Sequence, residues 1–233
     1  MNIFRYISSE LNLLSCPACG TGNGSGINDL CEECRSKLIF FSGRCCKNCG
    51  GELDGVLHCC SKCLREGERP YLEAVSVFAY CGEGKDFVLD FKSNHILPYG
   101  RIFAKMLSER IKQHKNWDFD IIVPVPLHWT RKLSRTFNQS ELVAKFMADN
   151  LMRHCCPAAL RRVTHTRSQK FLSDKERHKN LQGAFQADSN SVKNKKILLV
   201  DDIFTTGATM SAAAEALLNA GAKCVYAASI ARA

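Results

Sequence analysis

The residues best suited to chemistry lie together between positions 201 and 209. Two adjacent carboxylates, Asp201 and Asp202, directly follow the apolar run of residues 197–200. Small and hydroxyl-bearing residues then form a turn: Thr205, Thr206, Gly207, Ala208 and Thr209. Carboxylates accept hydrogen bonds from neighbouring hydroxyls, as on a ribose. Backbone amides at a helix start, with threonine hydroxyls beside them, hold an anion. The stretch is therefore suited to bind a sugar phosphate.

The elements around this stretch predict how the chain positions it. Residues 197–200 are apolar β-formers, which is typical of a strand buried on both faces. After the turn, apolar residues recur at helical spacing as far as the stop signal Gly221, and Gly207 lets the backbone approach a ligand closely. The alternative is a buried strand that ends in an ordinary polar turn. However, two adjacent acids there repel each other unless solvent, a cation or hydroxyl donors face them.

A second informative stretch is residues 121–127, where two prolines interrupt an apolar strand. Prolines cannot donate ladder hydrogen bonds, so they end the strand and fix the direction of the chain that follows. The chain that follows is basic and contains His128, Arg131, Lys132 and Arg135. Ligands of open α/β sheets bind outside the carboxyl ends of the strands. We therefore expect this basic loop and the two acids to face one crevice.

The 14 cysteines include four Cys-x-x-Cys pairs within fewer than fifty residues. Two such turns place four thiolates at the corners of a tetrahedron, as zinc requires. The favoured ligand sets are sequential: Cys16, Cys19, Cys31 and Cys34, then Cys46, Cys49, Cys60 and Cys63. A cross-braced pairing stays open, and so does replacement of a second-site ligand by Cys45 or Cys59. A redox dithiol or a disulfide framework is the alternative.

Length and charge suggest two units, residues 1–70 with the cysteine pairs and residues 71–233 with the acid turn. Residues 1–70 hold eight Lys/Arg and eight Asp/Glu, so the remainder carries the whole formal charge of +9. Residues 128–180 hold twelve Lys/Arg against four Asp/Glu, a field that suits a polyanion such as pyrophosphate or a nucleic-acid backbone.

No apolar run is long enough to cross a bilayer, and residues 1–14 favour an amphipathic helix over a signal peptide. We expect a cytoplasmic protein with no membrane insertion.

Further patterns predict an α/β protein. Strands are expected at residues 74–80, 160–163 and 222–230, and helices at 87–92, 102–111 and 137–151. Residues 160–185 suit either a mobile lid or a surface hairpin. Lys92, near a helix end, is interpreted as a solvated lysine rather than a phosphate contact.

The acid turn resembles the phosphoribosyl-pyrophosphate (PRPP) signature of type I phosphoribosyltransferases, an apolar run followed by Asp-Asp, an apolar pair and Thr-Thr-Gly-x-Thr. The chain as a whole resembles the ComF family of competence-associated and GntX-like proteins from about Cys16 onward. The resemblance is carried by the four cysteine pairs, Tyr80, Lys92, residues 124–127 and 135–141, Thr166, Gln169, Leu172, Arg177, Asn180, Ala184, Phe185 and the acid turn.

The resemblance implies a type I phosphoribosyltransferase-like parallel sheet flanked by helices, preceded by a small N-terminal double zinc-ribbon domain. It implies transfer of ribosyl 5-phosphate from PRPP, with Mg²⁺, to an unknown acceptor, in a setting of DNA uptake. Asp201 and Asp202 would hold the ribose hydroxyls, and the turn from Thr205 to Thr209 the 5-phosphate. Arg131, Lys132 and Arg135 would contact the pyrophosphate.

A competing hypothesis is a binding protein without catalysis. In this reading the PRPP site is retained as a sensor or a vestige, while the ribbons and the basic surface bind single-stranded DNA or a competence helicase. The sequence does not identify the acceptor or the oligomeric state.

Overall fold

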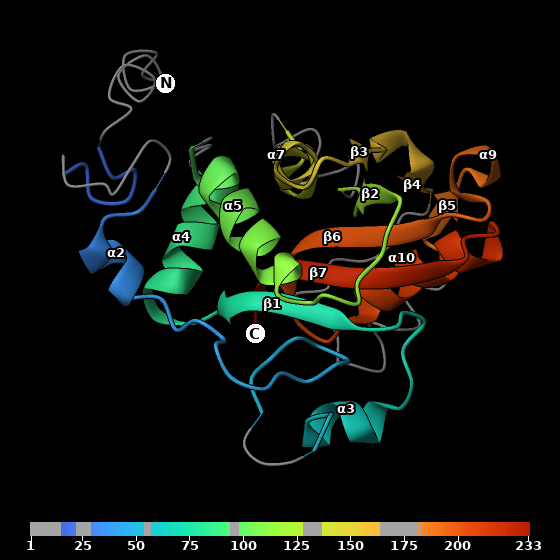
Figure 1. Ribbon diagram of the computed structural model, residues 1–233, viewed down its shortest axis with the longest axis horizontal. Helices are drawn as coiled ribbons and strands as arrows, with labels where there is room; N and C mark the ends of the chain where they lie inside the picture. The colour runs from blue at the N-terminus through green and yellow to red at the C-terminus, as the bar shows by residue number, and fades with distance from the viewer. Residues whose placement is uncertain are drawn as a thin grey trace.

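The computed structural model describes residues 15–21, 29–53, 57–93, 98–127, 137–163, 181 and 183–233. A five-stranded sheet with the order β1-β7-β6-β2-β3 forms its centre (Figure 1). Its strands, all parallel, are β1 (Ala74–Ala79), β2 (Ile121–Pro124), β3 (His154–Cys155), β6 (Lys196–Phe204) and β7 (Cys224–Arg232). A second, antiparallel sheet pairs β4 (Leu160–Arg162) with β5 (Phe185–Ala187). The predicted α/β class is confirmed.

Helices cover both faces of the parallel sheet. One face carries α4 (Gly82–Ser93), α5 (Pro98–Lys112) and α7 (Gln139–Leu151), and the other carries α10 (Ala208–Asn219) (Figure 1). The shorter elements are α2 (Glu32–Ser36), α3 (Ser61–Glu66), α9 (Ser189–Val192) and the 3-10 helix η1 (Pro157–Ala159).

Strand β6 is buried on both faces, as its sequence predicts. Leu198 and Val200 belong to the core beneath α5 and α7, whereas Ile197 and Leu199 belong to the core with α10. All four side chains are fully buried. The alternation follows from the two-residue period of a strand.

Strand β6 is longer than its apolar run. It continues through both acids to Phe204, because β7 pairs with it as far as Arg232. The acids therefore lie in the last part of the strand rather than after it. The short helix α9 begins after Asp188, whose side chain accepts a hydrogen bond from the Asn190 N–H and caps the helix. The expected helix at residues 1–14 and most of the expected lid lie outside the described residues.

The cysteine-rich part closes the free edge of β1. The Phe41 N–H donates to the Val77 carbonyl, and the Ala79 N–H donates to the Ile39 carbonyl, both at 2.9 Å. Cysteines of the first cluster join the core beneath α4 and α5, and those of the second join the core with α10. Exposed sheet edges attract other strands, so this contact protects the sheet. The division at residue 70 stays a prediction.

Within the described part of the chain, every helix is too short or too polar to span a bilayer.

The two glycines that follow the first pair of each cluster give a matched test of this packing. Both have positive φ, +76° at Gly20 and +69° at Gly50. A Cβ on Gly50 would lie 2.4 Å from the Ser76 nitrogen, whereas one on Gly20 meets nothing within 4 Å. Replacing Gly20 by Ala should cost about 1 kcal/mol of unfolding free energy from backbone strain alone. Replacing Gly50 by Ala should cost at least about 1–3 kcal/mol more, because β1 must shift. Denaturant unfolding of the zinc-loaded variants measures both, and equal losses would contradict the packing.

Candidate functional site

The acid-and-threonine stretch forms a small hollow where β6 ends. The backbone reverses at Gly207, which has a φ of +78° and precedes the first residue of α10. A Cβ at this position would lie 2.5 Å from the Phe204 ring, so glycine is required both for its φ and for space. The hollow is lined by Asp201, Ile203, Phe204, Thr205, Gly207, Thr209 and Met210. One acid and the predicted anion-binding turn therefore share one space.

Several amides of this turn are left for an external acceptor. The Ala208 N–H donates to Thr206 Oγ1 at 3.3 Å. In the part of the chain that the structure describes, no group accepts from the N–H of Gly207, Thr209 or Met210. The first bond of the helix runs from the Ser211 N–H to the Gly207 carbonyl at 2.8 Å, so the three amides precede it, and the Thr206 carbonyl accepts from Arg69 at 3.0 Å. Free amides at the start of a helix suit a phosphate.

The two acids are held by groups from three elements. Asp201 Oδ1 accepts from Ser140 Oγ of α7 at 3.0 Å and from the Asp202 N–H at 2.8 Å. Asp202 Oδ2 lies 2.8 Å from Lys92 Nζ of α4, and these side chains are 14% and 12% exposed. Burial, followed by the neighbouring Asp202 carboxylate, raises the pKa of Asp201 to about 7. Lys92 beside the Asp202 carboxylate compensates part of the charge of the pair.

The interpretation of Lys92 as solvated is wrong. Its stem is buried at the end of α4 and its ammonium group pairs with Asp202. Ser140 received no role from the sequence, although it belongs to the stretch 135–141 that carries the family resemblance. Asn138 explains the position of Ser140, because its side chain accepts from the Ser140 N–H and donates to the Val125 carbonyl at 3.1 Å. Short-range periodicity could not reveal the contact of Lys92 with Asp202 or that of Ser140 with Asp201, since the partners in each are at least 61 residues apart.

Arg131, Lys132 and Arg135 lie outside the described residues, so their predicted contact with pyrophosphate stays a prediction. The strand that leads to them is placed as expected. Pro124 is paired with Val200 in the parallel ladder, and the Val125 N–H donates to the Val200 carbonyl at 2.8 Å. The end of β2 therefore emerges beside the acids of β6.

The eight predicted metal ligands form two separate clusters, and the pairing is sequential. The sulfur atoms within each cluster lie within 4.8 Å of one another: Cys16, Cys19, Cys31 and Cys34 in the first, and Cys46, Cys49, Cys60 and Cys63 in the second. Cys19 and Cys31 have sulfur atoms 3.6 Å apart, and Cys49 and Cys60 have theirs 3.9 Å apart. Tetrahedral zinc with bonds of about 2.3 Å requires a sulfur–sulfur distance of about 3.8 Å. Both clusters therefore fit zinc.

The two neighbouring cysteines lie outside these clusters. Cys45 Sγ accepts a hydrogen bond from Arg110 at 2.9 Å, and Cys59 is buried beside the second cluster. All cysteines of the described residues are free thiols, so the disulfide alternative is not supported. The Cys60 N–H points to Cys46 Sγ at 3.4 Å, a contact that stabilises a thiolate.

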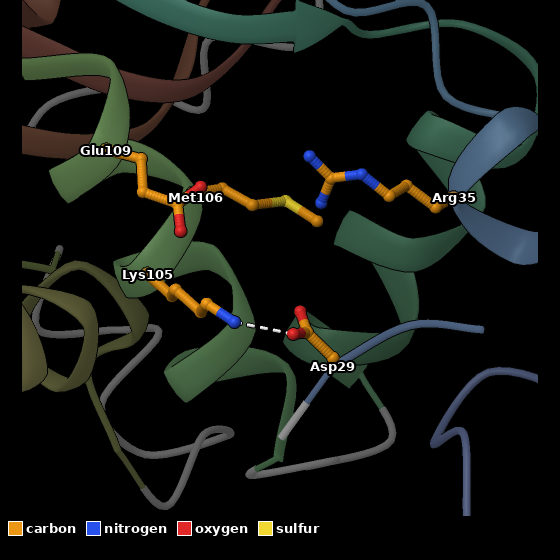
Figure 2. Close-up of a pocket in the computed structure, with 5 residues that line it drawn as sticks. All are labelled: Asp29, Arg35, Lys105, Met106 and Glu109. Atoms are coloured by element: carbon orange, nitrogen blue, oxygen red, sulfur yellow. Dashed lines mark hydrogen bonds and ion pairs between the residues drawn. The ribbon is translucent and has the colours of Figure 1, made fainter. Parts of the chain in front are cut away.

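A cleft near the first cluster is a separate feature. This cleft of about 240 Å³ is lined by Asp29, Arg35, Lys105, Met106 and Glu109 (Figure 2). Lys105 of α5 forms an ion pair with Asp29 across it. Because cations and carboxylates alternate around it, the cleft offers no excess charge of either sign to a ligand.

Comparison with known proteins agrees with this arrangement. The family model for the phosphoribosyl transferase domain matches residues 95–233. Competence protein ComFC of Streptococcus pneumoniae is 31% identical over 206 residues, which cover 87% of both chains. The chain belongs to the ComF family. Competence protein F of Haemophilus influenzae is another relative, 28% identical over 88% of this chain and 91% of that protein.

Membership in the ComF family accounts for the layout. The parallel sheet is that of the phosphoribosyltransferase domain, and a small double-cluster region precedes it. Among solved structures, glutamine PRPP amidotransferase from B. subtilis is 20% identical, with a TM-score of 0.40 over 57% of this chain. The chain spans 26% of that enzyme, and the score is too low to support an inference about function.

The zinc content of cysteine variants should distinguish metal ligands from neighbouring cysteines that bind no metal. The unmodified chain should bind two zinc ions. Replacing Cys60 by Ser should leave about one, since three thiolates hold zinc more weakly than four, whereas replacing Cys45 by Ser should leave two. Elemental analysis after dialysis measures the ratio. Loss of zinc on replacing Cys45 would show that the cluster assignment is wrong.

The raised pKa of Asp201 predicts a pH-dependent gain in stability when the residue is replaced by Asn. An unfolded aspartate ionises near 3.8, whereas Asp201 ionises near 7 in the fold. Its ionisation therefore destabilises the fold progressively from pH 4 to pH 7. The Asn variant keeps an oxygen for Ser140 and carries no charge. Its unfolding free energy should match the parent near pH 4 and exceed it above pH 7, by up to about 4 kcal/mol. Urea unfolding of the ligand-free proteins across this range measures the difference. A gain that is independent of pH would contradict the assignment.

Proposed function

We propose that the chain binds PRPP at the hollow where β6 ends and transfers its ribosyl 5-phosphate to an acceptor, releasing pyrophosphate. The observation that carries the proposal is the shared space of an acid and open amides, formed by Asp201, Gly207 and Thr209. The hollow measures only about 10 Å³. It has the size of a single water molecule, so a phosphate group would lie against its open amides rather than inside it.

In this proposal the two ends of the stretch bind different parts of the sugar. The amides and hydroxyls from Thr205 to Thr209 hold the 5-phosphate, and the Asp201 and Asp202 carboxylates accept from the ribose hydroxyls. Lys92 offsets part of the negative charge of the acids, so that both can be ionised when hydroxyl donors arrive. Mg²⁺ would accompany PRPP as part of the substrate and offset the charge of its pyrophosphate.

Catalysis in this proposal depends on stabilising a leaving group. Cleavage of the bond between the anomeric carbon and pyrophosphate creates positive charge on the ribose ring and negative charge on the pyrophosphate. Preorganised cations lower the energy of such a transition state, and Arg131, Lys132 and Arg135 are the proposed cations. The acids hold the ribose while the bond breaks. No residue of the chain is assigned as the attacking group, which belongs to the acceptor.

We assign the biological setting to the uptake or use of DNA, because the relatives are named competence proteins. Zinc in both clusters would be structural, since each has four protein ligands and leaves no open position for substrate.

Replacing both Asp201 and Asp202 by Asn should weaken PRPP binding by at least about 100-fold, because neutral amides accept less strongly from hydroxyls. Isothermal calorimetry with PRPP and Mg²⁺ measures the change. The matched control replaces Asp118 and Asp120 by Asn. These acids contact Lys196 at the opposite end of β6, and PRPP affinity should be unchanged.

The same variant separates enzyme from binding protein. Pyrophosphate release with candidate acceptors and natural transformation should both fail when the acids are lost. Loss of PRPP binding with intact transformation and intact DNA affinity would refute the enzyme in favour of the binding protein.

A further inference from the structure

We propose that Arg69 is a positioning residue that connects the second cysteine cluster to the turn at residues 205–209. Metal bound in that cluster then holds the turn in its ligand-binding form. The inference rests on the proposed function, because it takes this turn as the site of the 5-phosphate. It adds a dependence of the sugar-phosphate site on one of the two clusters.

Arg69 lies between α3 and the start of α10, with a side chain only 4% exposed. Its guanidinium donates to the Thr206 carbonyl at 3.0 Å and to Ser211 Oγ of α10 at 3.3 Å. The same group pairs with Glu66, the last residue of α3. A rigid planar fork can hold three acceptors in a fixed relation, which a flexible ammonium group cannot do.

The hydrogen bond to Thr206 sets the direction of an amide in the hollow. All peptide bonds between described residues are trans, so the Thr206 C=O and the Gly207 N–H of one peptide point in opposite directions. Arg69 draws the carbonyl toward itself and thereby turns the Gly207 N–H away from its guanidinium. Arg69 thus fixes the direction of one of the open amides.

The metal cluster fixes the other end of this connection. Cys60 is the residue before α3 and Cys63 lies within it, so two ligands of the second cluster flank the start of the helix. A helix of six residues is not stable by itself, so α3 depends on the two metal ligands at its start. Without metal, Glu66 would no longer hold Arg69 against the turn.

A second arginine makes a parallel contact. The side chain of Arg232 and the sulfur of Cys49 both lie against Gly51, and the Arg232 guanidinium lies 5.6 Å from the centre of the Phe204 ring. That ring packs directly beneath Gly207. A cation suits this position, because zinc with four thiolates carries a net negative charge. Arg232 and Phe204 therefore form a second line of contacts between the region of the second cluster and the turn.

The test uses the full-length, zinc-loaded chain and two readouts, amide hydrogen exchange of residues 205–211 and calorimetric binding of ribose 5-phosphate. Replacing Arg69 by Gln should raise the amide exchange of residues 205–211 and weaken the binding of ribose 5-phosphate by about tenfold or more. It should leave the zinc content at two and the affinity for inorganic pyrophosphate unchanged. Arg65→Gln, on the exposed surface of α3, is the matched control and should change nothing. Arg69→Lys should recover part of the affinity.

Dependence on metal is tested by comparing the two clusters. Cys60→Ser should raise exchange in residues 205–211, whereas Cys19→Ser in the first cluster should not. If Cys60→Ser does not fold, Glu66→Gln keeps all metal ligands and should raise exchange by itself. Exchange and affinity unchanged in Arg69→Gln, or equal effects of the two cysteine variants, would overturn the inference. If the unmodified chain binds no ribose 5-phosphate, the proposed function fails, and the exchange data alone decide whether the connection exists.

Discussion

Two carboxylates next to each other at the end of a buried strand are the constraint on which the rest of this site depends. Each loses hydration and each repels the other. The fold compensates with Lys92 at the end of α4, Ser140 at the start of α7 and the Asp202 N–H itself. Helices α4 and α7 lie on the same face of the sheet, so both can reach the end of β6. The arrangement leaves Asp201 with a raised pKa, and hydroxyl donors from a ligand would stabilise its ionised form and lower that pKa.

The second constraint concerns hydrogen bonds that the protein does not make. A helix start normally has unsatisfied amides, and here Arg69 fixes the peptide that carries the Gly207 amide by donating to the Thr206 carbonyl. The cysteine-rich part supplies this arginine and also covers the edge of β1. It therefore serves the sheet and the turn together. Four cysteine ligands in each cluster would leave zinc no open coordination position for catalysis, which agrees with a structural role for both clusters.

Sequence patterns predicted the features that are determined by residues close together in the sequence. The double burial of β6, the end of β2 at its prolines and the two cysteine clusters follow from short-range spacing, and the structure confirms them. The length of β6 does not follow from short-range spacing, because pairing with β7 extends the strand through two acids that have poor strand propensity. Lys92, Ser140 and Arg69 also escaped prediction. Their partners lie 61 to 137 residues away or on another element, and no periodicity encodes such contacts.

The central claim is that the amides after β6 are presented to the phosphate of a sugar. The most direct measurement is a titration with ribose 5-phosphate followed by ¹H–¹⁵N correlation spectra. We predict a saturable downfield shift of the Gly207 amide proton, with Thr209 and Met210 shifting at the same ligand concentration. Resonances of the cleft at Asp29 and Lys105 should not move. Shifts confined to that cleft or to the cysteine clusters, with Gly207 unchanged, would contradict the account.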